Sequence, residues 1–123
     1  MEKEFVTYEQ ALALKELGLN IDNYLGVYGL DGRHLYNVHG NKFDVVDEMF
    51  FIKAPLKQQV FRWFREKYSF YVELGHGPRI DFYFTIYKDS ISISEKNDYS
   101  TYEEAENACI DKLIEIAKQQ SND

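Results

Sequence analysis

The segment from 58 to 74 mixes basic and aromatic side chains, a combination that proteins use to hold single-stranded nucleic acids. Arg62 and Arg65 could contact phosphates there, while rings such as Trp63 could stack on bases. The other interpretation is a core helix whose rings are buried and whose arginines lie on its wet face. Glu66 favours this second interpretation, because it stands four residues after Arg62, the spacing of an ion pair on a helix.

A second candidate binding surface consists of tyrosines further along the chain. Tyr71, Tyr83 and Tyr87 fall at alternate positions of predicted strands. Such rings can stack on bases, as in RNA-recognition domains, yet the sequence lacks the basic and aromatic run that marks those domains. They also suit a protein interface, because tyrosine gives a large contact area at a small cost in entropy. The remaining alternative is that another layer of the protein, or a second copy in a homodimer, covers them.

The other reactive residues form no recognisable catalytic or metal-binding pattern. His34, His39 and His76 have none of the spacings of a zinc site, and the acidic cluster at 44–48 lacks the alternation of an EF-hand loop. Cys109 falls at an apolar position of a predicted helix, which is typical of a buried cysteine. We therefore predict no metal, no cofactor and no catalytic residue, and a small enzyme of unknown class is the third alternative for the function.

The sequence predicts three helices, and several of the residues named above lie on them. A capping box begins at Thr7 and another at Thr101, which predicts helices over about 7–17 and 101–119. A proline in the first turn and a broad apolar face predict a third helix over about 55–68.

Strand patterns fill much of the remaining chain. An Asp-Gly turn within 24–38 predicts a β-hairpin, and the segment that follows predicts one interrupted strand or two short ones. From 70 to 94 the residues alternate, which predicts a three-stranded antiparallel meander with one apolar face and one Tyr/Ser/Thr face. Ile91 and Ile93 are predicted to lie on the apolar face.

The predicted fold class is α+β. We expect a single two-layer domain over 1–123 with a frayed tail at about 120–123. An antiparallel sheet of about five strands would carry the helices on one face. The core would join Phe82 and Phe84 of the meander with Trp63 of the third helix.

Composition and charge narrow the classes of partner. Aromatic residues make up 16% of the chain, too many for a disordered segment. The 21 acidic and 14 basic residues give a net charge of -7, which opposes general binding to a phosphate backbone and favours a basic partner. One cysteine, no apolar leader and no run long enough to cross a bilayer predict a cytoplasmic protein without membrane contact.

Three blocks of the sequence resemble one known family. They are TYEQALALKELG at 7–18, APLKQQVFRWFREKY at 54–68 and TYEEAENACIDKLIEIAK at 101–118. In this order they resemble a family of small uncharacterised proteins from bacteriophages, prophages and mobile elements of Bacteroides-like gut bacteria, chiefly through the QQxFRWFREKY block. The resemblance implies a phage or mobile-element setting within a bacterial host, and it carries no catalytic residue over to this chain. Small acidic proteins from such settings often act by binding host proteins, including defence systems.

We therefore predict a non-catalytic accessory protein that binds a host or phage protein, in an inhibitory or anti-defence role. The alternative is a protein that binds a single-stranded nucleic acid or a nucleotide through two arginines and the strand tyrosines. The candidate binding residues are Arg62, Arg65, Tyr71, Tyr83 and Tyr87.

Overall fold

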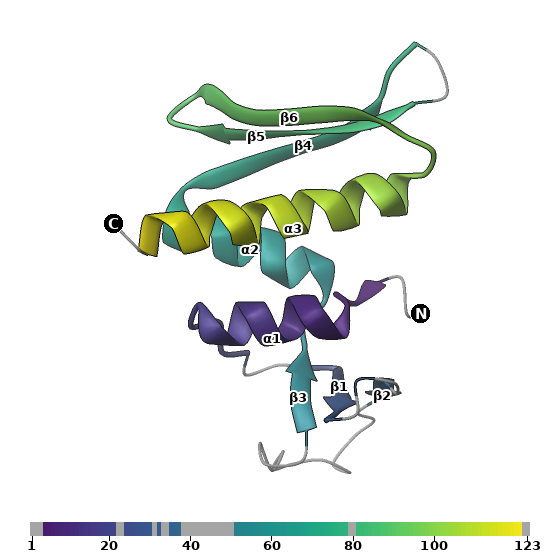
Figure 1. Ribbon diagram of the computed structural model, residues 1–123, viewed down its shortest axis with the longest axis vertical. Helices are drawn as coiled ribbons and strands as arrows, with labels where there is room; N and C mark the ends of the chain where they lie inside the picture. Colours follow the sequence, from purple (N-terminus) through teal and green to yellow (C-terminus); the bar gives the residue numbers. More distant parts are fainter. Residues whose placement is uncertain are drawn as a thin grey trace. The chain divides into compact units, whose positions relative to one another are not determined.

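Figure 1 shows the computed structural model, in which two compact units, residues 1–59 and 60–123, follow one another along the chain. The sequence prediction of a single domain stays a prediction. No helix within the described ranges is long and apolar enough to cross a membrane. The structure describes residues 4–21, 24–30, 32, 35–37, 51–78 and 81–121.

The first unit contains a helix that contacts a small antiparallel sheet. The strands are ordered β2-β1-β3, and α1 contacts β3. The pairing of β1 with β2 confirms the predicted hairpin, although Asp31 of its turn lies outside the described residues. The elements are α1 (Tyr8–Glu16), β1 (Gly26–Gly29), β2 (Leu35–Asn37) and β3 (Phe51–Ala54).

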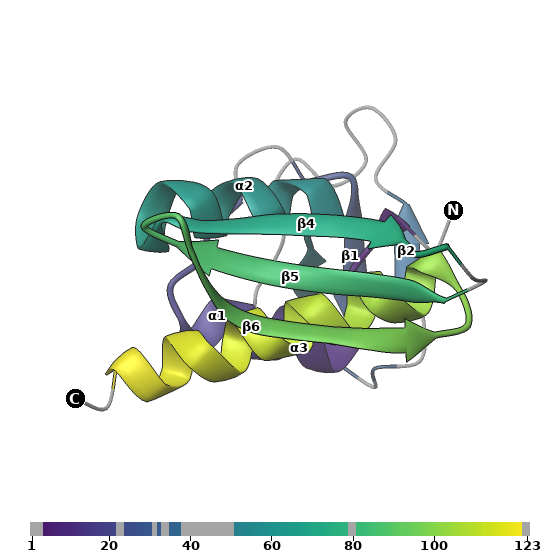
Figure 2. The ribbon, with the colours of Figure 1, turned by 90° about the horizontal axis from the view of Figure 1, so that it is seen from above.

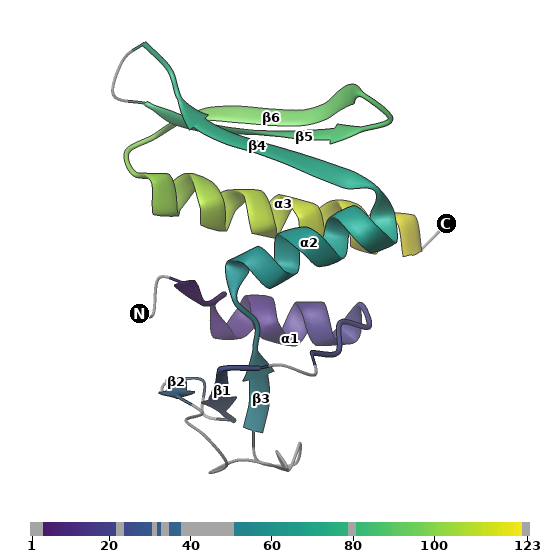
Figure 3. The same ribbon diagram turned by 180° about the vertical axis from the view of Figure 1, so that it is seen from behind.

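The second unit is an antiparallel meander that carries helices on one face only. The strand order is β4-β5-β6, and α3 contacts all three strands. Figures 1 and 3 show α2 and α3 on the same side of this sheet, and Figure 2 looks down on its other side, where none of the described elements of this unit lies. The elements are α2 (Lys57–Tyr68), whose first three residues belong to the first unit, and β4 (Phe70–His76), β5 (Phe82–Lys88), β6 (Ile91–Tyr99) and α3 (Tyr102–Ser121).

The α+β class and the three helices are confirmed, but the prediction of one sheet of about five strands is wrong. The six described strands form two three-stranded sheets. Alternation along the chain indicates where a strand lies and which face is apolar, but it does not say which strands pair with each other. Because β1, β2 and β3 are only three or four residues long, they carry little alternation from which a partner could be recognised.

Side-chain hydrogen bonds begin two of the helices. At α1, Thr7 Oγ1 accepts the Gln10 N–H at 3.2 Å and Gln10 Oε1 accepts the Thr7 N–H at 2.9 Å, which confirms the first capping box. At α3 only half of the predicted box forms. The Glu104 N–H donates to Thr101 Oγ1 at 3.1 Å, but the Glu104 carboxylate accepts the N–H of Ser100 at 3.3 Å, one residue earlier than predicted.

The helix-covered face of the meander holds the core of the second unit. Phe70, Phe84 and Ile86 alternate onto this face and are buried. On α2, Phe64 is fully buried and its ring stacks on that of Phe70, with 6.2 Å between the centroids. Trp63 is only half-buried, so it lies at the margin of the core rather than at its centre as predicted.

The edge strand β6 departs from the predicted alternation because it contains two bulges. Its register slips once between Ile86 and Tyr87 of β5 and once between Phe82 and Phe84. The first slip leaves an extra residue, Ile93, in β6. Ile91 lies before this slip, opposite Lys88 at the hairpin end of the sheet. Neither isoleucine is covered as predicted: Ile91 is 66% exposed and Ile93 is 42% exposed.

Candidate functional site

The side of the β4–β5–β6 sheet opposite its helices, which we call the outer face, carries the three predicted tyrosines. The strand register places Tyr71 beside Tyr87 and Gly75 beside Tyr83. Side chains two residues apart on a strand point to the same face, so Tyr83 and Tyr87 of β5 share it. Tyr71 is 55% exposed, which makes it the most accessible ring of the three. The structure thus gathers the tyrosines on one surface.

Tyr83 lies across a glycine of the neighbouring strand. A Cβ atom at Gly75 would stand 3.0 Å from Tyr83 Oη and 3.2 Å from its Cζ. The ring therefore occupies the space that a side chain at position 75 would need. This contact holds the Tyr83 ring over β4 instead of leaving it free in solvent.

A row of two carboxylates and a hydroxyl lies between the tyrosines. Glu73 of β4 pairs with Thr85 of β5, which pairs with Glu95 of β6. Cross-strand neighbours of this kind have Cβ atoms about 5 Å apart. The row therefore places one negative charge on each side of the Thr85 hydroxyl group.

Both carboxylates influence the ionisation of Tyr87 on the outer face. The Tyr87 hydroxyl donates to Glu73 Oε1 at 3.4 Å, which is long for an O–H···O bond. The negative charge of Glu73 is the main cause that raises the pKa of Tyr87 above its ordinary value, and desolvation and the charge of Glu95 also raise this pKa. A phenolate would add a third negative charge here, so Tyr87 stays neutral at ordinary pH.

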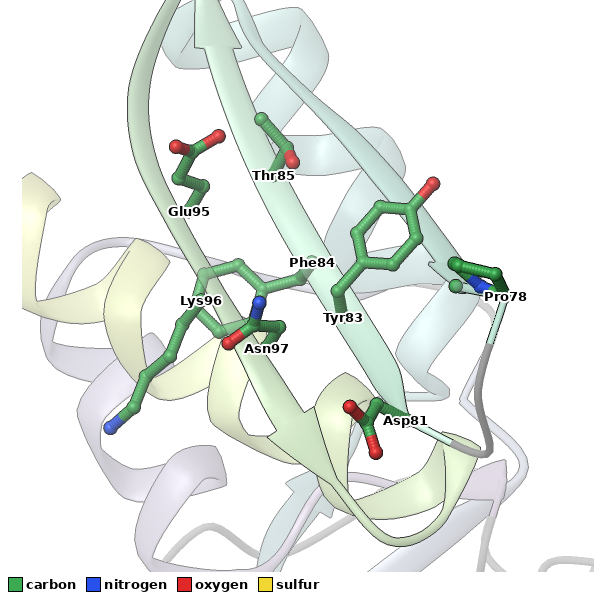
Figure 4. Close-up of a pocket in the computed structure, with 9 residues that line it drawn as sticks. Pro78, Asp81, Tyr83, Phe84, Thr85, Glu95, Lys96 and Asn97 are labelled. Atoms are coloured by element: carbon green, nitrogen blue, oxygen red, sulfur yellow. The ribbon is translucent and has the colours of Figure 1, made fainter.

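One end of the outer face is hollowed. The hollow has a volume of about 580 Å³, within the range of ligand pockets, roughly 300–1,000 Å³. Figure 4 shows side chains from β5 and β6 around it, with the ammonium group of Lys96 directed away from the other polar groups. The polar side chains that line it are those of Asp81, Tyr83, Thr85, Glu95, Lys96 and Asn97.

Thr85 is the buried polar member of the hollow. The residue is 6% exposed, and its hydroxyl makes no hydrogen bond with any residue that the structure describes. The hydroxyl oxygen is not among the fully buried unsatisfied atoms, so it is the part of Thr85 that reaches solvent. The Thr85 hydroxyl is therefore available, as both donor and acceptor, to a group that enters the hollow.

The two predicted arginines do not lie with the tyrosines. Arg62 and Arg65 are exposed on α2, which lies on the helix side of the sheet (Figure 3). Arg62 Nε donates to Glu66 Oε1 at 2.9 Å, the ion pair that the spacing predicts. Lys57, which adds to the positive charge of this segment, is buried. The structure therefore separates the basic helix face from the aromatic sheet face.

The described ranges contain no group of three or more His, Cys, Asp or Glu side chains that could hold a metal ion. His76 is exposed, with Nδ1 3.1 Å from the carbonyl oxygen of Gly77. His34, His39 and the acidic cluster at 44–48 lie outside the described residues.

Cys109 is expected to resist thiol reagents while the protein is folded. It is fully buried on α3, and burial, with a smaller effect of the Glu106 charge, raises the pKa of the thiol to about 12. At pH 8 only about one molecule in ten thousand would carry the reactive thiolate. The rate of reaction with a chromogenic disulfide, measured in buffer and in denaturant, should rise by orders of magnitude on unfolding.

The pH dependence of stability gives a second readout for Cys109. Because its folded-state pKa is raised, the contribution of this thiol to stability is present below about pH 9 and is lost as the pH rises toward about 12. Fast labelling of the folded protein at pH 8 would contradict the buried environment.

Glu73 and Thr85 lie on the outer face with the tyrosines, as the alternation of the sequence predicts. Glu95 was not predicted there, because the bulge in β6 changes which of its residues point outward.

The outer face must be interpreted from its own side chains. Comparison of the chain with protein-family models, with curated proteins and with solved structures finds no match.

Proposed function

We propose that this is a non-catalytic protein whose outer face binds a basic segment of a partner protein, either of the host or of a phage. One observation carries the proposal: tyrosine rings and carboxylates share this face, and no described lysine or arginine directs its charge into it. The resemblance to small phage proteins agrees with a host partner and with an inhibitory or anti-defence role.

The charge of the outer face favours lysine and arginine in the partner. Glu73 and Glu95 stand in one cross-strand row of an open sheet, on either side of Thr85 and with no described cation between them, so they produce a negative potential over the surface. A cationic side chain would relieve the repulsion between these carboxylates. The same potential repels phosphate groups, which argues against a nucleic acid as the ligand of this face.

The tyrosines add contact area to this charge. Tyrosine is enriched in protein interfaces, and its ring attracts a lysine or arginine that lies over its face. Within the molecule, Lys67 Nζ already lies 5.1 Å from the ring centroid of Trp63, so cation–π contacts form readily on this chain. Tyr71 and Tyr87 are expected to make the corresponding contacts with the partner.

The proposal can be tested with fluorescently labelled probes of defined charge. We expect a short peptide that alternates arginine with serine to bind at low ionic strength and to dissociate as salt is added. A peptide of equal length that alternates glutamate with serine, and an oligothymidylate, should not bind. The proposal would be overturned if the basic peptide fails to bind or if the oligothymidylate binds as tightly.

A further inference from the structure

We infer that the basic segment of the partner binds as an added β-strand beside β4, with its charged side chains over the outer face. The inference depends on the proposed function, because it concerns the same surface. It adds that the partner segment is extended, pairs with β4 through its backbone and alternates basic with apolar residues. In peptide recognition of this kind, backbone hydrogen bonds supply affinity and alternate side chains supply specificity.

Strand β4 forms an open edge of its sheet. Of the described strands it pairs only with β5, and none of the described residues outside β5 is hydrogen-bonded to its backbone. Figure 3 shows β4 along the near edge of the sheet, with α2 in the helix layer beneath it. An edge strand presents a row of backbone N–H and C=O groups that another strand can use. The β4 edge is therefore a template for one more strand.

The two edges of this sheet differ in how well they could accept a strand. Proteins protect edge strands with bulges, lysine and proline. Strand β6 has two register slips and an exposed lysine, Lys96. Strand β4 is seven residues long, pairs with β5 without a slip and contains neither lysine nor proline. The regular backbone of β4 is thus the edge that an incoming strand can follow.

The side chains of β4 define what the added strand would carry. Tyr71 and Glu73 point to the outer face, where a basic side chain would meet a ring and a carboxylate. Val72 and Leu74 point to the other face and are only half-buried, whereas their partners on β5 are buried. Apolar side chains of an added strand would cover both. Because side chains alternate between the two faces of a strand, the partner segment should alternate basic and apolar residues.

Charge favours a basic segment over a second copy of this chain. An antiparallel pair of two β4 strands that uses all seven residues must be centred on Glu73, the middle residue of the strand. The two Glu73 side chains would then stand directly opposite each other, and like charges in that position are destabilising. A lysine or arginine opposite Glu73 forms an attractive cross-strand pair instead.

Three peptides of equal length test the inference on the wild-type protein. One alternates arginine with valine, the second is this parent peptide with N-methyl groups on two neighbouring central residues, and the third is the arginine–serine peptide. We expect the methylated peptide to bind at least tenfold more weakly than the parent. Whichever edge the peptide presents, one methyl group faces β4, removes a hydrogen bond and holds the strands apart. The parent should bind about tenfold more tightly than the arginine–serine peptide, because its valines cover Val72 and Leu74.

Amide hydrogen exchange locates the added strand. With the parent peptide bound, the β4 amides that point away from β5 should exchange more slowly, and those of β6 should keep their rates. Protection of β6 without β4 would overturn the inference. A dimer in sedimentation of the peptide-free protein, with protected β4 amides, would also overturn it, because the edge would then belong to a second copy.

The outcomes separate this inference from the proposed function. Equal affinity for the parent and methylated peptides would overturn strand addition and leave the proposed function standing, as would binding of the arginine–serine peptide alone. Equal affinity for the parent and arginine–serine peptides would overturn the apolar half of the predicted pattern. Failure of all three peptides to bind would overturn both the inference and the proposed function.

Discussion

Replacing Phe84 with alanine is expected to lower the free energy of unfolding by about 3–5 kcal/mol. Phe84 is 2% exposed on the central strand of the meander, on the face that α3 covers, and its ring stacks on Tyr99 with 6.1 Å between centroids. Strands β4 and β6 hold β5 on both sides, so the surrounding structure cannot close the cavity easily. Since domains of this size are stable by about 5–15 kcal/mol, the loss is a large share of the total.

Urea denaturation followed by circular dichroism measures this change. Tyr71→Ala removes an aromatic side chain from the same sheet at a position that is 55% exposed, so its unfolding midpoint should move far less. Phe82→Ala should fall between the two, because Phe82 is only half-buried at the end of β5. Equal midpoints for Phe84→Ala and Tyr71→Ala would contradict the assignment of the core face.

Reversing the charges at Glu73 and Glu95 is expected to weaken binding of the basic peptide about thirtyfold. An exposed ion pair contributes about 0.2–1 kcal/mol, and a double reversal removes two attractions and adds two repulsions, which gives about 2 kcal/mol. Both side chains are exposed, so Glu73→Lys with Glu95→Lys should leave the fold intact.

A control variant must change the net charge by the same amount at other positions. Glu16 on α1 and Glu115 on α3 are exposed and lie off the outer face, so changing both to lysine provides it. The control variant should weaken binding only through its change in net charge. Its loss of affinity should be smaller than that of the variant with Glu73→Lys and Glu95→Lys. If both variants lose affinity equally, binding depends on net charge and not on the outer face.

The helices could be predicted because their signals are local. Thr7 and Gln10 are three residues apart, so the capping box that begins α1 is visible in the sequence. The apolar face of α2 is visible in the same way, although the spacing alone did not show that Phe61 is buried and Trp63 half-buried. That difference depends on tertiary packing, which periodicity does not record.

The meander was predicted, and the organisation of the strands into two sheets was not. Strand β5 alternates clearly because its apolar residues face helices, whereas the end of β6, with Glu95, Lys96 and Asn97, has no apolar residue to reveal a face. The bulges of β6 arise from its pairing with β5 and have no local signature.

The candidate site was predicted in part. Tyr71, Tyr83 and Tyr87 were identified from alternation, and the structure brings them together. Arg62 and Arg65 were placed beside them in one hypothesis on the basis of composition, but their helix lies on the other side of the sheet. The hollow could not be predicted, because it depends on side chains that only strand pairing brings together.

Mapping the peptide by nuclear magnetic resonance tests the central claim most directly. Isotope-labelled protein is titrated with the arginine–serine peptide, and the backbone amide shifts are followed. We predict that the largest changes cluster at Tyr71, Glu73, Tyr83, Thr85 and Glu95, while α2 is unaffected. Changes confined to α2 around Arg62 and Arg65, or no changes at saturating peptide, would contradict the outer face as the binding surface.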